Sequence, residues 1–423
     1  MIKFRETLRL LRRLNAMKNV IVFGAGAAGL MAAYAAAKNG NAVTVLERNE
    51  KAGKKIYITG KGRCNVTNNV PPEEFFENVV RNAKFLKKSI YSFSPERLMK
   101  LLEEGGLPLK TERGNRVFPA SEHASDVTKC LQRYCSEAGV RFAFNERVES
   151  IEKTPDAGFR VRTEKGNCSA DAVIICTGGL SYPGTGSTGD GYTFAKKFGL
   201  KIVPCRASLC GIECDMRMLS QLQGLSLRNV RISAYRQSRL VASHFGEMLF
   251  THYGISGPIV LSLSAALNDF PVKELNLQID LKPALETEIL DKRLLRDFEK
   301  FKNKQMQNAL VELLPKNLIV PVLRLANIPS DLMANSLTKQ QRKSLCAAIK
   351  NFALRPTSLR PISEAVVTAG GVDVAQLDPK TMECKSVPGL YLCGEVLDVD
   401  ALTGGFNLHI AFATGYAAGS SIS

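Results

Sequence analysis

Three glycines and one glutamate have the spacing of a dinucleotide-binding site. Gly24, Gly26 and Gly29 follow a short apolar segment, residues 19–23, and open an alanine-rich segment that runs to about Lys38. In the strand, turn and helix that this pattern predicts, the glycines permit a tight turn, a close approach of the backbone to a pyrophosphate, and close packing of helix on strand. Free N–H groups and the positive end of the helix dipole then face the phosphates.

Glu47 completes the pattern. It ends a second apolar segment, residues 42–46, and lies eighteen residues after Gly29. A carboxylate at this place accepts hydrogen bonds from a ribose diol and repels a 2′-phosphate. The sequence therefore predicts FAD or NAD at this site, and not NADP.

A second Gly-x-Gly-x-x-Gly string, residues 184–189, lacks this context. The apolar segment before it, residues 172–176, ends eight residues too early, and Pro183 stands directly before the first glycine. No segment that ends in an acid follows at the right distance. We therefore predict a loop that lies against a cofactor bound elsewhere, and no second Rossmann unit.

Length and composition are typical of an ordinary folded protein of two or three domains, with 423 residues and 45% hydrophobic side chains. Residues 20–37 carry no charge, but their glycines and their change of periodicity indicate a strand, a turn and a helix, so no membrane partner is expected. The 11 cysteines include no C-x-x-C pair and no zinc spacing. This predicts reduced thiols in a cytoplasmic protein without a metal site.

Basic residues exceed acidic residues by 57 to 40, a net charge of +17. This excess favours an anionic ligand or partner, and a generic surface charge is the alternative. Between residues 216 and 242 there are five arginines and no acid: Arg217, Arg228, Arg231, Arg236 and Arg239. They indicate either a surface for a polyanion such as ribosomal RNA or a solvated strand face.

Longer strings complete the pattern: residues 59–68 read TGKGRCNVTN, residues 250–258 read FTHYGISGP and residues 389–395 read GLYLCGE. Together with GSTGDGY at 186–192 and VTAGGV at 367–372, they resemble the BaiN/RdsA-type family of NAD(P)/FAD-dependent oxidoreductases, also called aminoacetone-oxidase-family FAD-binding enzymes. The resemblance covers residues 18–423. It implies an α/β fold in which a Rossmann-type FAD-binding domain, like that of the two-dinucleotide-binding flavoproteins, carries an inserted β-barrel-like domain and a small helical subdomain.

The FAD motifs stand at both ends of the chain, so the segment between them is an insertion. Alternating residues at 228–235 and 275–281 predict strands, and Glu286 and Glu288 form the acidic first turn of a helical stretch. We expect a basic N-terminal extension at 1–16, either a weakly ordered helix or the product of an upstream start codon, and the first part of the FAD-binding domain at 17–205. A β-rich insert follows at 206–283 and a helical subdomain at 284–350. The segment 351–423 returns to the FAD-binding domain, which the chain re-enters near Pro361.

The resemblance also implies how FAD is held. It puts the diphosphate on Gly24, Gly26 and Gly29, and the ribose on Glu47. It assigns the flavin side to Lys55, Arg63, Cys64, Asn65 and Thr67, the adenine to Val148, the diphosphate side to Thr177 and Gly178, and the ribityl chain and pyrimidine ring to Gly394, Glu395, Gly405, Asn407 and Leu408. The N–H groups of Asn407 and Leu408, at the start of a helix, would stabilise negative charge on a reduced flavin.

No catalytic residue follows from the sequence. The candidates are Cys64, Thr251, His252 and Ser256, which lie in family strings expected to face the flavin cleft, and packing or turn hydrogen bonds account for each of them equally well. His409, where the family often has Gln, is interpreted as a structural imidazole.

The expected function is that of an FAD-dependent oxidoreductase with NAD(P)H as electron donor. Without a second Rossmann unit, NAD(P)H would use the same open face of the flavin as the substrate. The first expectation for the substrate is a small molecule, a steroid or bile-acid-like enone whose C=C conjugated to a carbonyl is reduced. The alternatives are a uridine of ribosomal RNA, reduced to dihydrouridine, and an amine oxidised by O₂; the oligomeric state stays open.

Overall fold

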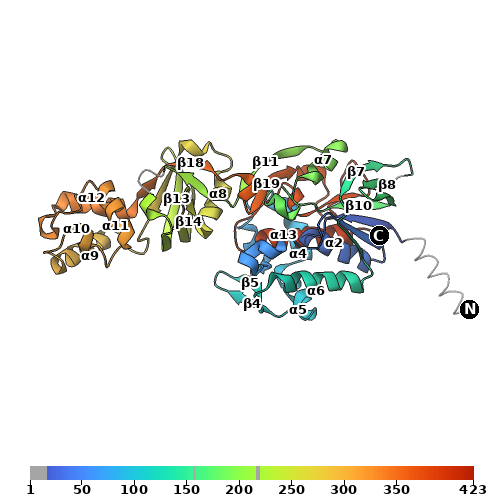
Figure 1. Cartoon of the computed structure of the whole chain (residues 1–423), viewed down its shortest axis with the longest axis horizontal. Coiled ribbons are helices and arrows are strands. Elements are labelled where there is room, and N and C mark those ends of the chain that lie inside the picture. Colours follow the sequence, from blue (N-terminus) through green and yellow to red (C-terminus); the bar gives the residue numbers. More distant parts are fainter. Residues whose placement is uncertain (1–16, 157, 216–219) are drawn as a thin grey trace, which may run out of the picture. The chain divides into compact units, whose positions relative to one another are not determined.

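The computed structural model describes residues 17–156, 158–215 and 220–423. The chain forms two compact units (Figure 1). Unit 1 contains the described residues up to Arg206 together with Ile362–Ser423, and unit 2 contains Ala207–Pro361. The predicted extension at 1–16 lies outside the described residues.

A five-stranded parallel sheet forms the centre of unit 1, with the strand order β20-β10-β1-β2-β6. Its strands are β1 (Asn19–Phe23), β2 (Ala42–Glu47), β6 (Arg141–Phe144), β10 (Ala172–Ile175) and β20 (Leu390–Leu392). Val22 and Val45 are fully buried, as expected for a parallel sheet covered on both faces. The uncharged residues 20–37 form β1, the glycine turn and α2 (Ala27–Lys38), so the predicted Rossmann-type arrangement is confirmed.

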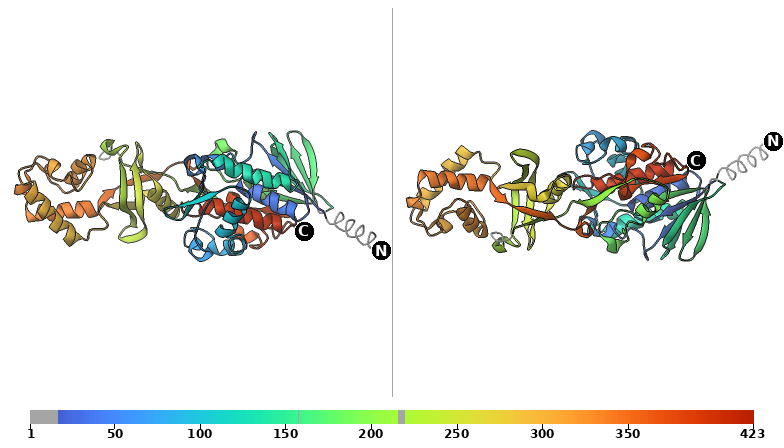
Figure 2. Two further views of the ribbon diagram at one scale, coloured as in Figure 1. Left: turned by 90° about the horizontal axis from the view of Figure 1, so that it is seen from below. Right: turned by 90° about the horizontal axis from the view of Figure 1, so that it is seen from above.

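Helix α2 and the C-terminal helix α13 (Phe406–Ser420) lie side by side (Figure 2). A Cβ added at Gly415 would lie 2.3 Å from the Ala28 carbonyl oxygen, and one added at Gly419 would lie 2.2 Å from that of Ala32. The two contacts advance in the same direction along both helices, so the helices are parallel. Only glycine permits this close approach of two backbones.

Smaller elements surround the sheet. Unit 1 also contains β3 (Thr67–Asn68), β4 (Leu109–Glu112) and β5 (Arg116–Pro119) in one sheet, β7 (Val148–Lys153), β8 (Phe159–Thr163) and β9 (Gly166–Ala170) in another, and the helices α3 (Pro72–Phe76), α4 (Ala83–Ser92), α5 (Pro95–Glu104), α6 (Ala124–Glu137) and α7 (Asp190–Lys197). Strands β11 (Ile202–Ser208) and β19 (Val367–Val372) pair where the chain leaves unit 1 and returns to it.

Unit 2 is built on a seven-stranded sheet with the order β17-β16-β13-β14-β15-β12-β18. The strands are β12 (Ile212–Cys214), β13 (Ser226–Arg236), β14 (Arg239–Phe250), β15 (Gly254–Ser256), β16 (Leu275–Asp280), β17 (Phe352–Leu354) and β18 (Pro356–Leu359). The edge strands β17 and β18 are separated in the chain by Arg355 alone. The two edges must therefore meet, which curls the sheet into the predicted barrel-like form.

Helices complete unit 2. Helix α8 (Pro258–Leu267) packs on the inner face of the sheet, and α9 (Thr287–Lys300), α10 (Met306–Ala309), α11 (Lys316–Leu325) and α12 (Lys339–Lys350) form the helical part drawn in orange in Figure 1. Leu290, Leu318 and Leu345 are fully buried between these helices and form one apolar core with the sheet. Among the described residues, none of the helices has both the length and the apolar character needed to cross a bilayer.

The return to the FAD-binding domain was expected in two forms, a segment that begins at residue 351 and a re-entry near Pro361. The chain returns to unit 1 at Ile362, which agrees with the second and differs from the first. Residues 352–359 belong to unit 2 because β17 pairs with β16 and β18 pairs with β12. The expected boundary at 205/206 differs from the observed one by a single residue.

Candidate active site

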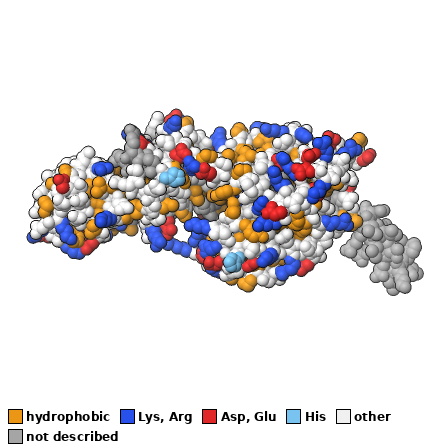
Figure 3. Space-filling model, in the orientation of Figure 1, with side chains coloured by type: hydrophobic (Ala, Val, Ile, Leu, Met, Phe, Trp, Pro, Cys, Tyr) orange, Lys and Arg blue, Asp and Glu red, His pale blue; other side chains and the backbone are white. Residues whose placement is uncertain are grey.

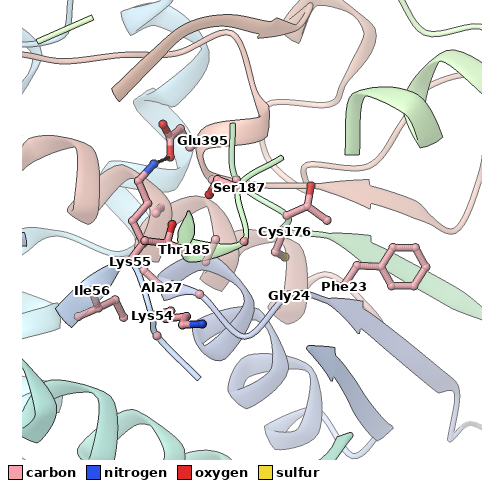
Figure 4. A pocket seen from close by; sticks show the side chains of 18 of the residues that line it. Phe23, Gly24, Ala27, Lys54, Lys55, Ile56, Cys176, Thr185, Ser187 and Glu395 are labelled. Carbon is pink, nitrogen blue, oxygen red and sulfur yellow. Dashed lines mark hydrogen bonds and ion pairs between the residues drawn. The ribbon is translucent and has the colours of Figure 1, made fainter. Parts of the chain in front are cut away.

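One cavity in unit 1 gathers most of the residues assigned to FAD (Figure 4). It lies at the carboxyl ends of β1, β2 and β10, which is where open α/β sheets bind their ligands. Its lining includes Gly24, Gly26, Glu47, Lys55, Val148, Thr177, Gly178, Gly394, Glu395, Asn407 and Leu408. The other assigned residues, Gly29, Arg63, Cys64, Asn65, Thr67 and Gly405, are not part of that lining.

The glycine turn leaves room for a ligand at one glycine only. At Gly29 a Cβ would lie 1.9 Å from the Gly24 carbonyl oxygen, so this glycine serves the packing of the turn. At Gly26, the N-cap of α2, an added Cβ would meet no atom within 4 Å. Helix α2 has no side-chain cap and no acid in its first turn. Its first N–H groups therefore remain available to an anion in the cavity.

Glu47 holds the turn from the second strand. Its Oε2 accepts a hydrogen bond from the Ala25 N–H at 2.7 Å, and its Oε1 accepts from the Asn49 N–H at 2.8 Å and from Asn49 Nδ2 at 2.7 Å. A carboxylate has about four acceptor positions, so one remains for a ribose hydroxyl. Glu47 thus shapes the glycine turn in addition to the role expected from its position.

Two helix N-termini face the same cavity. The first residues of α13, Asn407 and Leu408, line it, and α13 also lacks a side-chain cap and an acid in its first turn. Because Ala28, the second residue of α2, contacts Gly415, the tenth of α13, helix α13 begins eight residues earlier along the shared direction. At 1.5 Å per residue the two N-termini are offset by about 12 Å. The arrangement suits an elongated ligand with negative charge at two places.

The residues present fit a bound dinucleotide in a further respect. Thr177 Oγ1 lines the cavity, is buried and has no hydrogen-bond partner in the structure. A buried hydroxyl without a partner is rare in proteins and points to a missing ligand atom. Together with the open space at Gly26, it supports a diphosphate at this end of the cavity.

Lys55 forms a hydrogen-bonded cluster in the cavity wall (Figure 4). Its Nζ lies 2.6 Å from Glu395 Oε2 and 2.6 Å from Ser181 Oγ, while Ser181 donates to Glu395 Oε1 at 2.7 Å. The Thr368 N–H also donates to Glu395 Oε1, at 2.9 Å. Burial opposes ionisation of Glu395, but Lys55, Ser181 and Thr368 outweigh it and hold the pKa of Glu395 below its ordinary value.

This cluster fixes an ammonium group in the cavity. An ammonium has three N–H donors, and Ser181 and Glu395 take two of those of Lys55, so one can be donated to a ligand. The Lys55 side chain is 23% exposed and that of Glu395 19%. Ser181 and Thr368 were not assigned to FAD from the sequence, although Thr368 lies in the string at 367–372.

The loop with the second glycine string lines the cavity as well. Thr185, Gly186 and Ser187 belong to the lining, and a Cβ at Gly186 would lie 2.6 Å from Asn49 Nδ2. Asp190, the first residue of α7, accepts hydrogen bonds from Arg147 at 3.1 Å. The loop is thus held against the β2 end of the cavity.

The assigned residues outside the lining have partners of their own. Arg63 forms an ion pair with Glu112 at 2.9 Å and stacks on the Phe118 ring. Burial raises the pKa of the Cys64 thiol to about 12, so this thiol is protonated at neutral pH. Asn65 Oδ1 is buried and has no hydrogen-bond partner in the structure. The FAD contacts assigned to these residues stay predictions.

Three catalytic candidates belong to unit 2. Thr251 and His252 lie in the turn between β14 and β15, and Ser256 ends β15. His252 is exposed, and its ring meets Tyr253 edge-on at 5.0 Å. Thr251 Oγ1 is buried without a hydrogen-bond partner in the structure. The cavity described above is lined by residues of unit 1 alone, so a catalytic role for these three stays a prediction.

His409 has the geometry of a structural imidazole. It is fully buried in α13, its Nε2 donates to the Phe93 carbonyl oxygen at 3.0 Å, and its Nδ1 accepts from Thr67 Oγ1 at 3.1 Å. The tautomer follows from these partners, since a carbonyl oxygen can only accept. Burial lowers the pKa of His409 to about 3, so the ring is neutral.

We expect His409 to make the protein sensitive to acid. The unfolded chain binds a proton at this ring below about pH 6.5, while the folded chain does not until about pH 3. Between these values the free energy of unfolding falls as pH falls, by about 1.4 kcal/mol per pH unit, hence about 2 kcal/mol at pH 5. The amide of His409→Gln can make both hydrogen bonds but does not titrate. Between pH 6.5 and pH 5 this variant should lose about 2 kcal/mol less of its free energy of unfolding than the parent, measured by denaturant titrations followed by circular dichroism. The exposed His123→Gln serves as control, and equal losses in the parent and H409Q would contradict the assignment.

Comparison with known proteins agrees with this geometry. The family model described as "HI0933-like protein Rossmann domain" matches residues 18–421. A 3-dehydro-bile acid Δ(4,6)-reductase of Clostridium scindens is 32% identical over 95% of this chain and 98% of its own length. A ribosomal RNA dihydrouridine synthase of Haemophilus influenzae is 34% identical over 95% of this chain and 98% of its own length. Among solved structures, a 3-ketosteroid-Δ4-(5α)-dehydrogenase of Rhodococcus jostii RHA1 shares the fold, with a TM-score of 0.52, 16% identity, and 96% of this chain and 97% of that chain covered.

Proposed function

This chain belongs to the HI0933-like family, as its motifs predicted, and from that membership we propose that it reduces a C=C conjugated to a carbonyl in a uracil base of ribosomal RNA. The chain is an FAD-dependent oxidoreductase with a Rossmann-type fold. We propose in addition the bond that it reduces, its substrate and its electron donor.

The names of the two relatives describe related chemistry. The Δ(4,6)-reductase acts on a 3-dehydro-bile acid, and the synthase makes dihydrouridine in ribosomal RNA. Dihydrouridine differs from uridine by saturation of the ring C=C that is conjugated to a carbonyl, and an enone presents the same group. In either case a hydride goes to the carbon far from the carbonyl and a proton to the nearer carbon. The identities of 32% and 34% do not separate the two substrates.

The distribution of charge favours RNA over a small-molecule enone as the substrate. Unit 2 contains 21 lysines and arginines against 13 acidic residues. In its described part, Arg228, Arg231 and Arg239 are exposed and form no ion pair, while Arg236 pairs with Glu274 at 2.9 Å. Arg217 lies outside the described residues. The described residues of unit 1 are closer to balance, with 31 lysines and arginines against 26 acidic residues, and Figure 3 shows both signs interspersed on the visible face. Unpaired arginines on an inserted unit suit a polyanion.

The residues around the cavity supply positions for this chemistry. FAD, when bound, supplies the hydride. Gly26 and the N-terminus of α2 would hold its diphosphate, and the N-terminus of α13 would stabilise negative charge at the other end of the cavity. The free N–H of Lys55 can hydrogen-bond to an oxygen that becomes negative as a carbonyl-conjugated C=C takes up hydride.

A small-molecule enone remains the second candidate. The specific observation in its favour is the match to the bile-acid reductase, which covers 95% of this chain. No relative named above acts on an amine, so the amine-oxidase alternative rests on the original resemblance alone. NAD(P)H is proposed as the electron donor for either substrate.

One experiment separates these substrates. The purified protein is expected to be yellow, and NADH or NADPH should bleach its flavin absorbance in the absence of oxygen. The reduced protein is then offered ribosomal RNA from a strain that lacks this gene, and, separately, a 3-oxo-Δ4 steroid. Dihydrouridine in the RNA, detected by mass spectrometry after nuclease digestion, is the expected result. Reoxidation by the steroid with unchanged RNA would favour the second candidate and reject the first.

A further inference from the structure

The hairpin of β13 and β14 presents aromatic and arginine side chains on its outer face. Phe245 is paired in register with Arg231, and Leu240 is paired with Tyr235. Directly paired residues of antiparallel strands point to the same side of a sheet. Helix α8 covers the opposite side, where a Cβ at Gly246 would meet Ile259 at 2.8 Å. We call the outward set the Phe245 face: Arg231, Ser233, Tyr235, Leu240, Ser243, Phe245 and Glu247.

The Phe245 face is open within unit 2. Phe245 is 54% exposed and Leu240 is 51% exposed. Exposed apolar surface that is rimmed by polar side chains is typical of an interaction site. Ser233 and Ser243, the next pair on this side after Arg231 and Phe245, hydrogen-bond to each other at 2.8 Å.

The charge on the hairpin is positive overall. Glu247, exposed two residues from Phe245 on the same side of β14, is the one acid in β13 and β14, against four arginines. Asp280, the neighbour of Arg231 on β16, is neutralised by Lys350 at 2.7 Å, and Glu274 is neutralised by Arg236. Arg231 itself forms no ion pair with any described residue and is exposed. The exposed ring therefore stands beside an unpaired guanidinium.

We propose that the Phe245 face binds unpaired RNA nucleotides, with one base stacked on Phe245 and Arg231 on the adjacent phosphate. Every base offers a flat π-face to an aromatic ring, and proteins that bind single strands combine such rings with cationic side chains on a sheet. The proposal rests on the proposed function, which requires an RNA substrate, and it assigns to unit 2 the binding of strand beside the reacting uridine. A duplex, whose bases are stacked already, would gain nothing from the ring.

The test uses the full-length FAD-loaded protein and a fluorescently labelled single-stranded oligouridylate. Phe245→Ala should weaken binding about 5- to 100-fold, the loss expected for one stacked base, and leave the salt dependence unchanged. Phe245→Tyr should bind like the parent. Arg231→Gln should reduce the slope of log K against log salt by about 1, because one phosphate contact is lost.

Two control variants lie elsewhere on unit 2. Ile289→Ala removes an apolar side chain that is 53% exposed on α9, and Arg324→Gln removes an exposed arginine of α11 that forms no ion pair with any described residue. Both should bind the oligouridylate like the parent. The melting temperature and the visible flavin spectrum of each variant exclude misfolding as a cause.

The outcomes separate this proposal from the proposed function. The Phe245 face is rejected if the parent does not bind the oligouridylate, or if F245A binds as tightly as I289A; the exposed ring would then belong to a protein interface. If the Phe245 face is rejected in this way but the parent still forms dihydrouridine, the chain is an RNA reductase that binds its RNA elsewhere. Weaker binding by F245A without dihydrouridine formation upholds the face and rejects the reaction.

Discussion

Gly26→Val is expected to remove FAD from the protein without unfolding it. An added Cβ at Gly26 meets no protein atom within 4 Å and points into the cavity, so the side chain takes the space proposed for the diphosphate. If two charge-assisted hydrogen bonds from the N-terminus of α2 are lost, at about 1.5–3 kcal/mol each, binding weakens by about 10²- to 10⁴-fold. FAD content after gel filtration and an FAD titration of the apoprotein measure this directly.

Two further substitutions make the result specific. Gly29→Val should unfold unit 1, because a Cβ there lies 1.9 Å from the Gly24 carbonyl oxygen and the backbone would have to move. Gly184→Val, in the exposed part of the second glycine string, meets no atom within 4 Å and should keep its FAD. A yellow G26V protein with parental affinity would show that the diphosphate does not lie on this turn.

The second large effect is expected for Lys55→Met. Loss of one fixed donor to a developing negative charge lowers turnover by about 10²- to 10³-fold in enzymes that use one. The variant also leaves Glu395 without its cation in a site where it is only 19% exposed, which destabilises the fold. Turnover is measured in the reductase assay and stability by thermal unfolding, with Lys51→Met, an exposed lysine outside the cavity lining, as control.

The double variant K55M/E395Q separates these two consequences. It removes both charges, so it should recover much of the stability lost in K55M while turnover stays low. Turnover that recovers together with stability would show that Lys55 acts only through folding. Acid provides a second check: the folded-state pKa of Glu395 is depressed, so its contribution is complete above pH 4.5 and is lost as pH falls through the lower, folded value. K55M should therefore show a smaller loss of stability in that range than the parent.

Local patterns predicted the local part of the site. The glycine turn and Glu47 lie within a single strand, helix and strand, and their roles follow from spacing alone. The helix start at Asn407 entered only through the family resemblance, because nothing near it in the sequence indicates a cofactor. The cluster of Lys55, Ser181 and Glu395 joins residues 126 and 340 positions apart, and periodicity carries no information about such contacts.

Short strands and irregular register account for what the sequence did not show in unit 2. Strands β17 and β18 have three and four residues, too few for an alternating pattern, which is why the boundary at residue 351 was placed too early. Phe245 lies fourteen positions from Arg231, and the register between β13 and β14 shifts twice. The aromatic neighbour of the arginine cluster therefore becomes visible only once the strands are paired.

The contact of α2 with α13 also sets an order of events during synthesis. Unit 2 is one continuous segment and can fold as soon as it has left the ribosome, whereas the FAD-binding unit needs both of its separated segments. The N-terminus of α2 is made about 380 residues before that of α13, an interval of roughly 20 to 75 seconds at 5–20 residues per second. During that time α13 is not yet available to cover the alanine-rich face of α2, so chaperones and proteases can reach this face. The inserted unit, which separates the two halves of the cofactor site, thereby also determines how long the nascent chain stays vulnerable.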